Sequence, residues 1–386
     1  MVKLGDYVKN SSRKNKNGGC TAVYSVTNSQ GFIPSTEYFS KEVYSKELGT
    51  YKLVDRGMIA YNPSRINVGS VALQDCVDQA IVSPLYVVFS VDDTRLSPEY
   101  VVRFLKSKPG LDQIAFRSIG TVRNNLKFDG LCQMDIAVPA LEVQEQCVIA
   151  LKGIESQKTL AEKYLSKLDE LVKSRFVEMF GGSSNEMLLR WPTKKLDDCV
   201  ESIDSGKSPN CRSESRQGNK PAVLKLSALS SGIFLAGENK VLPEGEEIPS
   251  DKEIRKGDIL VARKNTPELV GACVLVKEDI SNLMFPDLVF RMHPFGNVEG
   301  SYLSALLSVS PFAAEVKLLA HGSAKSMSNI PKSELKKLML PIPPLELQQE
   351  FAFFVQQVDK LKFIAQQQIE KLQELYDSLA QEYFGS

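Results

Sequence analysis

One 44-residue segment occurs twice in this chain, and no other feature limits its possible folds as strongly. Residues 139–182 read PALEVQEQCVIALKGIESQKTLAEKYLSKLDELVKSRFVEMFGG, and residues 343–386 read PPLELQQEFAFFVQQVDKLKFIAQQQIEKLQELYDSLAQEYFGS, at a constant offset of 204. A segment repeated without insertions is typical of a chain built from two like halves. We therefore expect two variable bodies, each followed by a similar tail, and two related binding surfaces.

The similarity extends from the tails into the bodies. The offset between matching positions drifts from 192 near the start of each half to 200, 202 and finally 204. The matching pairs are Lys3–Val8 with Lys195–Val200, Gly57–Ala60 with Gly257–Leu260, Tyr100 with Tyr302, and Gly120-Thr121 with Gly322-Ser323. Chance similarity of apolar patterns is the alternative, but matches that keep their order favour an internal duplication.

The repeated tails have the apolar spacing of long helices. Steps of four and three residues alternate, as in the a/d seam of paired helices. The residues that we expect to pair are Ala161, Leu165, Leu168, Val172, Met179, Ala365, Ile369, Leu372, Tyr376, Leu379 and Tyr383. A helix from about 142 to 180 would be roughly 58 Å long. Because so long an exposed seam is unstable in water, we expect the tails to form an antiparallel coiled coil; a bundle with another subunit is the alternative.

The bodies, residues 1–138 and 183–342, mix short strands with short helices. The runs with strand character are Met58–Tyr61, Leu85–Phe89, Asp258–Val261 and Asp287–Arg291, and the run with helix character is Pro98–Leu105. Frequent Gly, Pro, Ser and Asn residues between these runs predict many loops, which commonly carry recognition. We expect an α+β fold with two globular bodies, joined by two long antiparallel helices and related by a pseudo-two-fold repeat.

Composition narrows the setting in which the chain works. Its 386 residues are enough for two or three domains, and its net charge at pH 7 is zero. No apolar run approaches the roughly 18 residues that span a membrane, and the N-terminus lacks the apolar core of a signal peptide. The seven cysteines are scattered without a C-x-x-C pair. We therefore expect a cytoplasmic protein with reduced thiols and no membrane partner.

Signals of catalysis are weak. Gly206-Lys207-Ser208 resembles the end of a phosphate-binding loop, but Glu201 occupies the position of its first glycine. Asn62-Pro63-Ser64-Arg65 matches only part of the Asn-Pro-Pro-aromatic motif of amino-methyltransferases. His293 and His321, the only histidines, lack the spacing of metal ligands. No nucleophile, base and orienting group come together, so we expect the chain to be non-catalytic on its own and to bind no metal.

Basic residues gather in loops although the whole chain is neutral. Acid-poor stretches surround Arg13–Lys16, Arg117–Lys127 and Lys207–Lys220. Such loops suit a protein that meets phosphates on one face and protein on another. Ordinary solvated loops are the alternative.

Taken together, these segments resemble the specificity subunit of type I restriction-modification systems. The resemblance rests on LDELVKSRFVEMFG at Leu168–Gly181, on the P-x-L-E-x-Q openings at Pro139 and Pro343, and on MIAYNPSRINVGSVAL at Met58–Leu73. It covers essentially the whole chain. One departure is that the chain begins almost directly at the first body, without a long leading helical region. We therefore expect its docking surfaces in the two tails.

What the resemblance implies is DNA recognition without catalysis. Residues 1–138 and 183–342 would be target-recognition domains, each reading one half of a split DNA site. Residues 139–182 and 343–386 would be conserved helical spacers that bind two methyltransferase subunits. Restriction subunits that translocate DNA would join the full complex. S-adenosylmethionine, ATP and Mg would be bound by these partners, and no cofactor by this chain.

The same resemblance gives weight to the basic loops as contacts to double-stranded DNA. Phosphate contacts set register, whereas Arg, Lys and Asn side chains can read base edges. In the first body we expect DNA contacts from Arg13, Lys14, Asn15, Lys16, Tyr61, Asn62, Ser64, Arg65, Arg117 and Arg123. In the second body we expect them from Lys207, Arg212, Arg216, Arg263, Lys264, Asn265, Lys325, Ser326 and Asn329. Arg65 and Arg263 follow corresponding strands and form the expected equivalent pair.

Two functions remain open at this point. A DNA-reading subunit predicts two short motifs separated by a fixed gap, with centres about one turn of B-DNA, roughly 34–36 Å, apart. The alternative is a non-catalytic coiled-coil scaffold whose bodies bind protein, which predicts no sequence-dependent binding of DNA.

Overall fold

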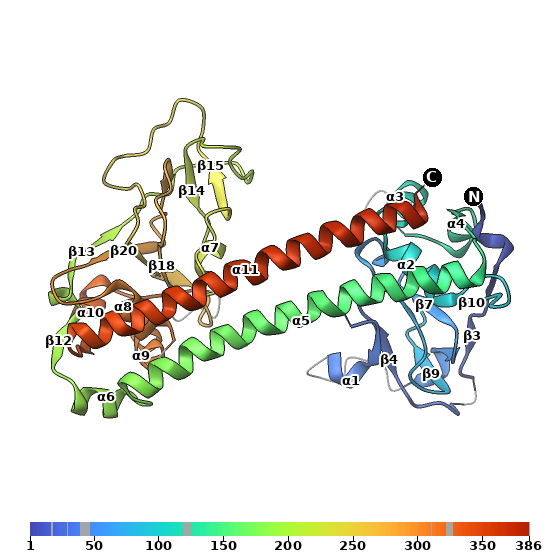
Figure 1. The fold of residues 1–386 in the computed structure, drawn as a ribbon, viewed down its shortest axis with the longest axis horizontal. Helices are drawn as coiled ribbons and strands as arrows, with labels where there is room; N and C mark the ends of the chain where they lie inside the picture. The colour runs from blue at the N-terminus through green and yellow to red at the C-terminus, as the bar shows by residue number, and fades with distance from the viewer. Residues whose placement is uncertain are drawn as a thin grey trace. The chain divides into compact units, whose positions relative to one another are not determined.

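The computed structural model describes residues 1–16, 18–28, 30–38, 47–118, 125–309, 311–321 and 327–385. The chain divides into two compact units. Unit 1 comprises Met1–Lys163 and Ala365–Ser386, and unit 2 comprises Tyr164–Ile364. Each unit therefore contains one body together with part of both repeated tails (Figure 1).

The body of unit 1 is built on a four-stranded antiparallel sheet of order β2-β10-β7-β8. Val87 of β10 lies opposite Tyr61 of β7, and Phe89 lies opposite Asn10 of β2. The side strands β2 and β7 therefore both end beside the beginning of β10. Three smaller sheets, β3-β6-β9, β4-β5 and β1-β11, complete the body.

The strands of unit 1 are β1 (Val2–Lys3), β2 (Val8–Asn10), β3 (Arg13–Lys14), β4 (Tyr24–Val26), β5 (Phe32–Pro34), β6 (Lys52–Asp55), β7 (Ile59–Tyr61), β8 (Val71–Leu73), β9 (Gln79–Val82), β10 (Val87–Val91) and β11 (Asp135–Ile136). Its short helices are η1 (Leu4–Asp6), α1 (Ser35–Tyr38), η2 (Leu48–Thr50), η3 (Ile66–Val68), α2 (Pro98–Lys106), α3 (Lys108–Arg117) and α4 (Phe128–Cys132).

The body of unit 2 is built on a four-stranded antiparallel sheet of order β13-β20-β16-β18. Ser205 of β13 lies opposite Phe290 of β20, and Ala262 of β16 lies opposite Val289. Here too both side strands end beside the beginning of the central strand. The smaller sheets are β15-β14-β19, β12-β22 and β17-β21.

The strands of unit 2 are β12 (Thr193–Lys195), β13 (Val200–Ser205), β14 (Ala222–Leu224), β15 (Asn239–Val241), β16 (Ile259–Ala262), β17 (Lys264–Asn265), β18 (Cys273–Leu275), β19 (Leu283–Met284), β20 (Val289–Pro294), β21 (Ser328–Asn329) and β22 (Met339–Pro341). Its short helices are α6 (Ser184–Arg190), η4 (Leu196–Asp198), α7 (Ser227–Ser230), α8 (Gly300–Ser308), α9 (Phe312–Leu318) and α10 (Lys332–Lys337).

Helices α2 and α8 both begin at a side-chain cap. Ser97 accepts a hydrogen bond from the backbone N–H of Tyr100, and Pro98 occupies the first turn, where a missing N–H costs nothing. Glu299 caps α8 in the same way through the N–H of Tyr302. The helix predicted over Pro98–Leu105 and all four predicted strands are present, although β10 and β20 each begin two residues later than expected. The mixture of strands and helices confirms the predicted α+β class.

The repeated tails form two helices of 40 residues each, α5 (Leu141–Phe180) and α11 (Leu345–Phe384). Figure 1 shows them as the two longest elements of the chain. In unit 2, Lys362 pairs with Asp169 and Arg175 pairs with Glu350 at 2.7 Å, so the two helices run in opposite directions there. In unit 1, Lys158 Nζ donates to Gln373 Oε1 at 2.7 Å.

The residues predicted to pair are all at least partly shielded from solvent, and some of them, such as Val172 and Tyr376, pack against the body cores. Ala161, Leu168 and Ala365 are buried. The others are half-buried, namely Leu165, Val172, Met179, Ile369, Leu372, Tyr376, Leu379 and Tyr383. Pairing as a coiled coil and descent from a duplication stay predictions.

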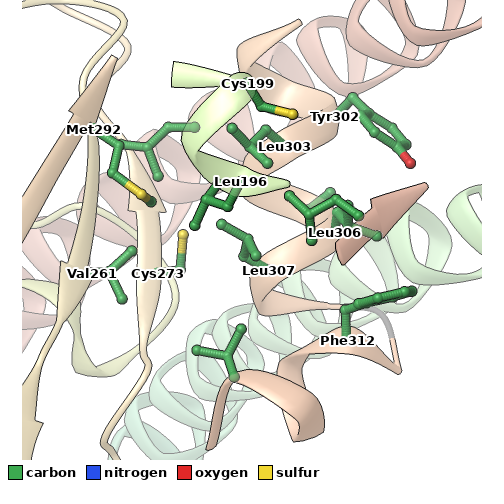
Figure 2. Close-up of a cluster of buried hydrophobic side chains, with 14 of the residues drawn as sticks. Leu196, Cys199, Val261, Cys273, Met292, Tyr302, Leu303, Leu306, Leu307 and Phe312 are labelled. Atoms are coloured by element: carbon green, nitrogen blue, oxygen red, sulfur yellow. The ribbon is translucent and has the colours of Figure 1, made fainter. Parts of the chain in front are cut away.

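Each unit packs its sheet and its short helices against the ends of α5 and α11. In unit 2, Phe176, Phe180, Tyr302 and Phe351 form one aromatic cluster, with ring centroids 4.8–5.8 Å apart. Figure 2 shows the adjoining part of this core, in which Leu303, Leu306 and Leu307 of α8 face Leu196, Val261 and Met292. In unit 1, Phe384 of α11 packs against Tyr100 and Phe104 of α2. The helix ends are therefore part of the body cores.

Candidate nucleic-acid interface

Part of the set of predicted DNA residues of unit 1 lies in segments that leave its main sheet at one edge. Arg13, Lys14 and Lys16 follow β2, and Asn62, Ser64 and Arg65 follow β7. Since both strands end beside the beginning of β10, both loops leave the sheet at the same edge. Ser11 N donates to Val88 O at 2.9 Å and holds the first loop against β10.

A second segment supports the loop after β7. Leu126 N donates to Pro63 O at 3.1 Å, and Ser64 Oγ donates to Asn125 Oδ1 at 2.6 Å. Asn62 Oδ1 accepts from Ser64 N at 3.1 Å and shapes the turn. Residues some 60 positions apart are thus held side by side, and Ser64 and Arg65 remain exposed.

Positive charge accumulates at this edge. Lys14 lies opposite Lys52 in the register of β3 and β6. Burial, and then the nearby Lys14, lower the pKa of Lys52. Arg13 is exposed and pairs with Asp55, which offsets part of the charge. A cavity of about 70 Å³ beside Arg65 is lined by Ser25, Thr27, Asn28, Asn62 and Tyr86, among others, so its walls are rich in hydrogen-bonding groups.

The corresponding edge of the main sheet in unit 2 brings together Arg263, Lys264 and Asn329 of the predicted residues of the second body. Arg263 directly follows β16, and its backbone N–H donates to Leu288 O at 2.9 Å. Lys264 lies opposite Asn329 in the pairing of β17 with β21. Ile330 N donates to Arg263 O at 2.8 Å, much as Leu126 N donates to Pro63 O in unit 1.

Arg263 is held in a fixed but incompletely satisfied position. Its guanidinium lies over the ring of Phe290 at 5.0 Å, and it donates to Ser205 Oγ at 3.4 Å and to Asn329 Oδ1 at 3.5 Å. Both bonds are long and therefore weak. Among the described residues, its Nε has no partner. A half-buried guanidinium with unused N–H donors can donate hydrogen bonds to a phosphate or to the edge of a guanine base.

Lys207 reaches this edge through a tight backbone contact. A Cβ at Gly206 would lie 2.0 Å from Phe285 O, so only glycine lets the chain pass there. Lys207 N donates to Phe285 O at 3.1 Å, and Ser208 pairs with Asp287. The Gly206-Lys207-Ser208 segment is thus a packed turn that leaves Lys207 exposed.

Three predicted DNA contacts are wrong, because the structure buries their side chains. Tyr61 is fully buried and donates to Leu126 O at 3.1 Å. Asn15 is buried and donates to Cys20 O at 2.8 Å. Asn265 is also buried, and its Oδ1 accepts from Thr266 N at 2.9 Å. All three stabilise the loops rather than face solvent.

Two predicted arginines are engaged with protein. Arg117 pairs with Asp135 at 3.4 Å, and Asp135 also pairs with Lys3 of β1. Arg216 Nη1 donates to Ser281 O at 2.9 Å and to Asn282 O at 3.0 Å. Neither guanidinium is aimed at a ligand by these contacts.

Arg212 lines a cavity of about 660 Å³ in unit 2. Lys220 shares this lining with Glu214, Glu244 and Glu246. Three carboxylates beside two cations make a poor site for a polyanion. Arg123, Lys325 and Ser326 lie outside the described residues.

The sequence did not reveal the residues that orient the predicted ones. Ser205 and Phe290 position Arg263, and Asn125 positions Ser64. Pairing the predicted strands over Asp258–Val261 and Asp287–Arg291 would have placed Phe290 near Arg263. Ser205 could not be placed in this way, because it lies on β13, which was not predicted and pairs with β20.

The histidines and cysteines have structural surroundings. The backbones of His321 and Asn329 exchange hydrogen bonds of 2.8 and 2.9 Å, and His293 Nδ1 lies 3.4 Å from Asp258 Oδ1. Burial raises the pKa of Cys147 to about 11 and that of Cys273 to about 12, which keeps both as thiols. Within the described ranges, no three His, Cys, Asp or Glu side chains are grouped to hold a metal ion. No helix there is both long and apolar enough to cross a membrane.

The sequence of this chain is similar to a family model and to curated proteins. The family model described as the type I restriction modification DNA specificity domain matches residues 189–374. The type I restriction enzyme EcoEI specificity subunit of Escherichia coli is 30% identical over 165 residues, which cover 42% of this chain and 28% of that subunit. The StySPI specificity subunit of Salmonella potsdam is 22% identical over 279 residues, covering 68% of this chain and 58% of that subunit. Less than two thirds of each relative is therefore matched.

Two solved structures share the fold. A structure of a type I R-M system, concerned with its complex assembly and conformational transition, has a TM-score of 0.58 at 17% identity and covers 99% of this chain and 96% of its own. The S subunit of the type I restriction-modification system from M. genitalium has a TM-score of 0.55 at 13% identity, over 100% of this chain and 96% of its own. The likeness extends along the whole chain.

Proposed function

We propose that this chain is the non-catalytic, sequence-reading subunit of a type I restriction-modification complex; its matches to the specificity-domain model over residues 189–374 and to the EcoEI specificity subunit support this. Each body would read one half of a bipartite site in double-stranded DNA. The observation that best supports this proposal is the position of the loops. In each main sheet, loops distant in sequence lie at one edge and place basic and amide side chains there.

An internal duplication, as we infer it, supports two reading heads. The main sheets have corresponding strand orders, β2-β10-β7-β8 and β13-β20-β16-β18. The backbone bonds from Leu126 to Pro63 and from Ile330 to Arg263 occupy matching places. Two heads of one design suit two half-sites of similar length.

The paired helices would act as an antiparallel coiled-coil spacer and as the docking surface for two methyltransferase subunits. Their outer sides expose large apolar side chains, which are costly in water and typical of protein interfaces. Those on α5 are Ile149, Leu160, Tyr164, Leu171 and Val177, and those on α11 are Phe353, Leu361, Phe363, Ile364 and Leu375.

Catalysis would belong to the partners. Methyltransferase subunits would bind S-adenosylmethionine, and restriction subunits would use ATP and Mg. The full complex would act on DNA in the cytoplasm. A scaffold that binds only protein is the competing function, and the exposed apolar side chains fit it as well as they fit methyltransferase docking.

Salt dependence of DNA binding separates these two functions. For a DNA reader assembled with its methyltransferase subunits, the logarithm of affinity falls linearly with that of salt, with a slope of about −0.9 for each phosphate neutralised. Affinity for the cognate duplex should also exceed that for a scrambled duplex. A scaffold predicts neither effect, and equal, salt-insensitive binding of both duplexes would contradict our proposal.

Stoichiometry tests the docking surface separately. Native mass spectrometry of the methyltransferase complex should give two modifying subunits for each copy of this chain. A one-to-one complex would contradict two equivalent docking surfaces while leaving DNA reading intact.

A further inference from the structure

The P-x-L-E-x-Q openings of the two tails end in glutamines that the DNA-reading function leaves unexplained. Gln144 and Gln348 lie in the first turns of α5 and α11, where an exposed polar residue would be ordinary. Both are instead completely buried, at 0% exposure. A buried primary amide must satisfy two N–H donors and one carbonyl acceptor, so its partners define its role.

In unit 1, Gln144 joins the helix to the linker before it and to the body. Its Nε2 donates to Pro139 O at 2.8 Å and to Arg95 O at 3.0 Å. Its Oε1 accepts from Ser97 N at 2.8 Å. Pro139 lies in the linker between β11 and α5, whereas Arg95 and Ser97 lie at the start of α2. One side chain therefore fixes three segments at the point where the body meets its helix.

In unit 2, Gln348 makes the same three bonds. Its Nε2 donates to Pro343 O at 2.7 Å and to Asn297 O at 3.1 Å, and its Oε1 accepts from Glu299 N at 2.9 Å. Ser97 and Glu299 are the residues that cap α2 and α8. The two glutamines therefore bind corresponding backbone groups in both units, although the residues that supply these groups are of different types.

Only an amide of this length suits the site. Two carbonyl oxygens face Nε2 and one N–H faces Oε1, so the orientation of the amide is set by its neighbours. A glutamate would place a carboxylate oxygen against the two carbonyl oxygens that Nε2 now binds. A methionine would make none of the three hydrogen bonds. The contacts hold the main chain on all sides, so they resist rotation of the body about the start of its helix.

We propose that Gln144 and Gln348 are positioning residues that set the angle between each DNA-reading body and its helix, and thereby the gap between the two half-sites. The inference rests on the proposed function. A residue that only stabilised the fold would, when replaced, lower binding to all DNA alike. A positioning residue, when replaced, relaxes the choice of gap while each body still reads its own half-motif.

The experiment is methylation mapping in a host that carries the system, with Gln144→Met or Gln348→Met in the full chain. The wild-type map gives the two half-motifs and their gap. In the variants, the methylated fraction at sites with a gap one base pair longer or shorter, relative to that at the wild-type gap, should rise by about tenfold or more, which corresponds to a loss of about 1.4 kcal/mol of discrimination. The half-motifs should stay the same.

Matched controls are available in the same turns. Gln146→Met and Gln349→Met replace exposed glutamines and should leave the gap unchanged. If a methionine variant does not accumulate, the glutamate substitution at the same position keeps the acceptor, removes the donors and is measured in the same way. If the wild-type motif is bipartite but the variants at Gln144 and Gln348 keep the wild-type choice of gap, the inference is wrong and the proposed function still stands. A wild-type map without a bipartite motif would overturn the proposed function and the inference with it.

Discussion

Single residues at the sheet edges divide into those that can meet a ligand and those that hold the loops. Lys207 is exposed, whereas Arg263 is half-buried beside Phe290 and Ser205. A flexible exposed lysine suits a phosphate contact, and an oriented guanidinium suits a base edge or a phosphate. The two residues should therefore differ in how their loss affects sequence preference.

Replacing Lys207 by alanine should weaken binding of all DNA sequences to a similar degree. Loss of one phosphate contact should also make the salt slope of the logarithm of affinity shallower by about 1. Fluorescence anisotropy of the assembled complex over a series of salt concentrations measures both effects. Lys195→Ala, an exposed lysine on β12, is the control. An unchanged slope in Lys207→Ala would remove Lys207 from the interface.

Asp258 gives unit 2 a predictable dependence on pH. Burial raises the pKa of its carboxyl group, although Arg255 N and the nearby Arg291 and His293 oppose this effect. A carboxyl group with a raised folded-state pKa stabilises the fold below its ordinary pKa and loses that contribution as pH rises through the folded value. The Tm of Asp258→Asn should therefore rise relative to wild type as the pH increases above about 4, the ordinary pKa of Asp. An opposite trend, or the same trend in the exposed control Asp198→Asn, would contradict this reasoning.

At this scale, exposure could be predicted from sequence where it follows from loop position, whereas contact with DNA stays a prediction. Ser64, Arg65 and Lys207 lie in loops and are exposed. Tyr61, Asn15 and Asn265 lie inside because neighbouring backbone carbonyl and N–H groups need partners. Which polar side chain satisfies the backbone depends on the path of the loop, and a single sequence does not specify that path.

At the scale of elements, the helices were predictable and their body contacts were not. A seam of period 3.5 over 40 residues allows no other regular structure, so α5 and α11 follow from the pattern. The same pattern does not reveal that Phe176, Phe180 and Phe351 belong to the core of a body. Assigning them to the core requires knowing that Phe176 and Phe180 contact Tyr302 of α8, which is distant from both in the sequence.

Two phenylalanines two residues apart on α11 separate core packing from docking. Phe351 is completely buried, whereas Phe353 is 64% exposed. Phe351→Ala should lower the free energy of unfolding by about 3–5 kcal/mol because it leaves a cavity among aromatic rings. Phe353→Ala should change it by less than about 0.5 kcal/mol. Chemical denaturation followed by circular dichroism gives both values, and equal losses would show that the helix face is wrongly assigned.

At the scale of the whole molecule, we propose two DNA-reading bodies of one design on helices of constant length. The repeated tails align without a gap, whereas the bodies differ by small insertions. Under this proposal, insertions in a body would change what it reads, whereas a change of helix length would alter the gap between half-sites. Net charge is zero because basic and acidic residues are equal in number, so the composition alone gives no sign of the DNA binding that we propose.

The most direct test of this claim is an exchange of one reading body. Residues 183–342 would be replaced by the second body of another family member, and the methylated sites of the host would be mapped before and after. We predict two short motifs with a fixed gap, of which only one motif changes while the other motif and the gap persist. A single continuous motif, or a change in both motifs, would contradict independent reading heads on a constant spacer.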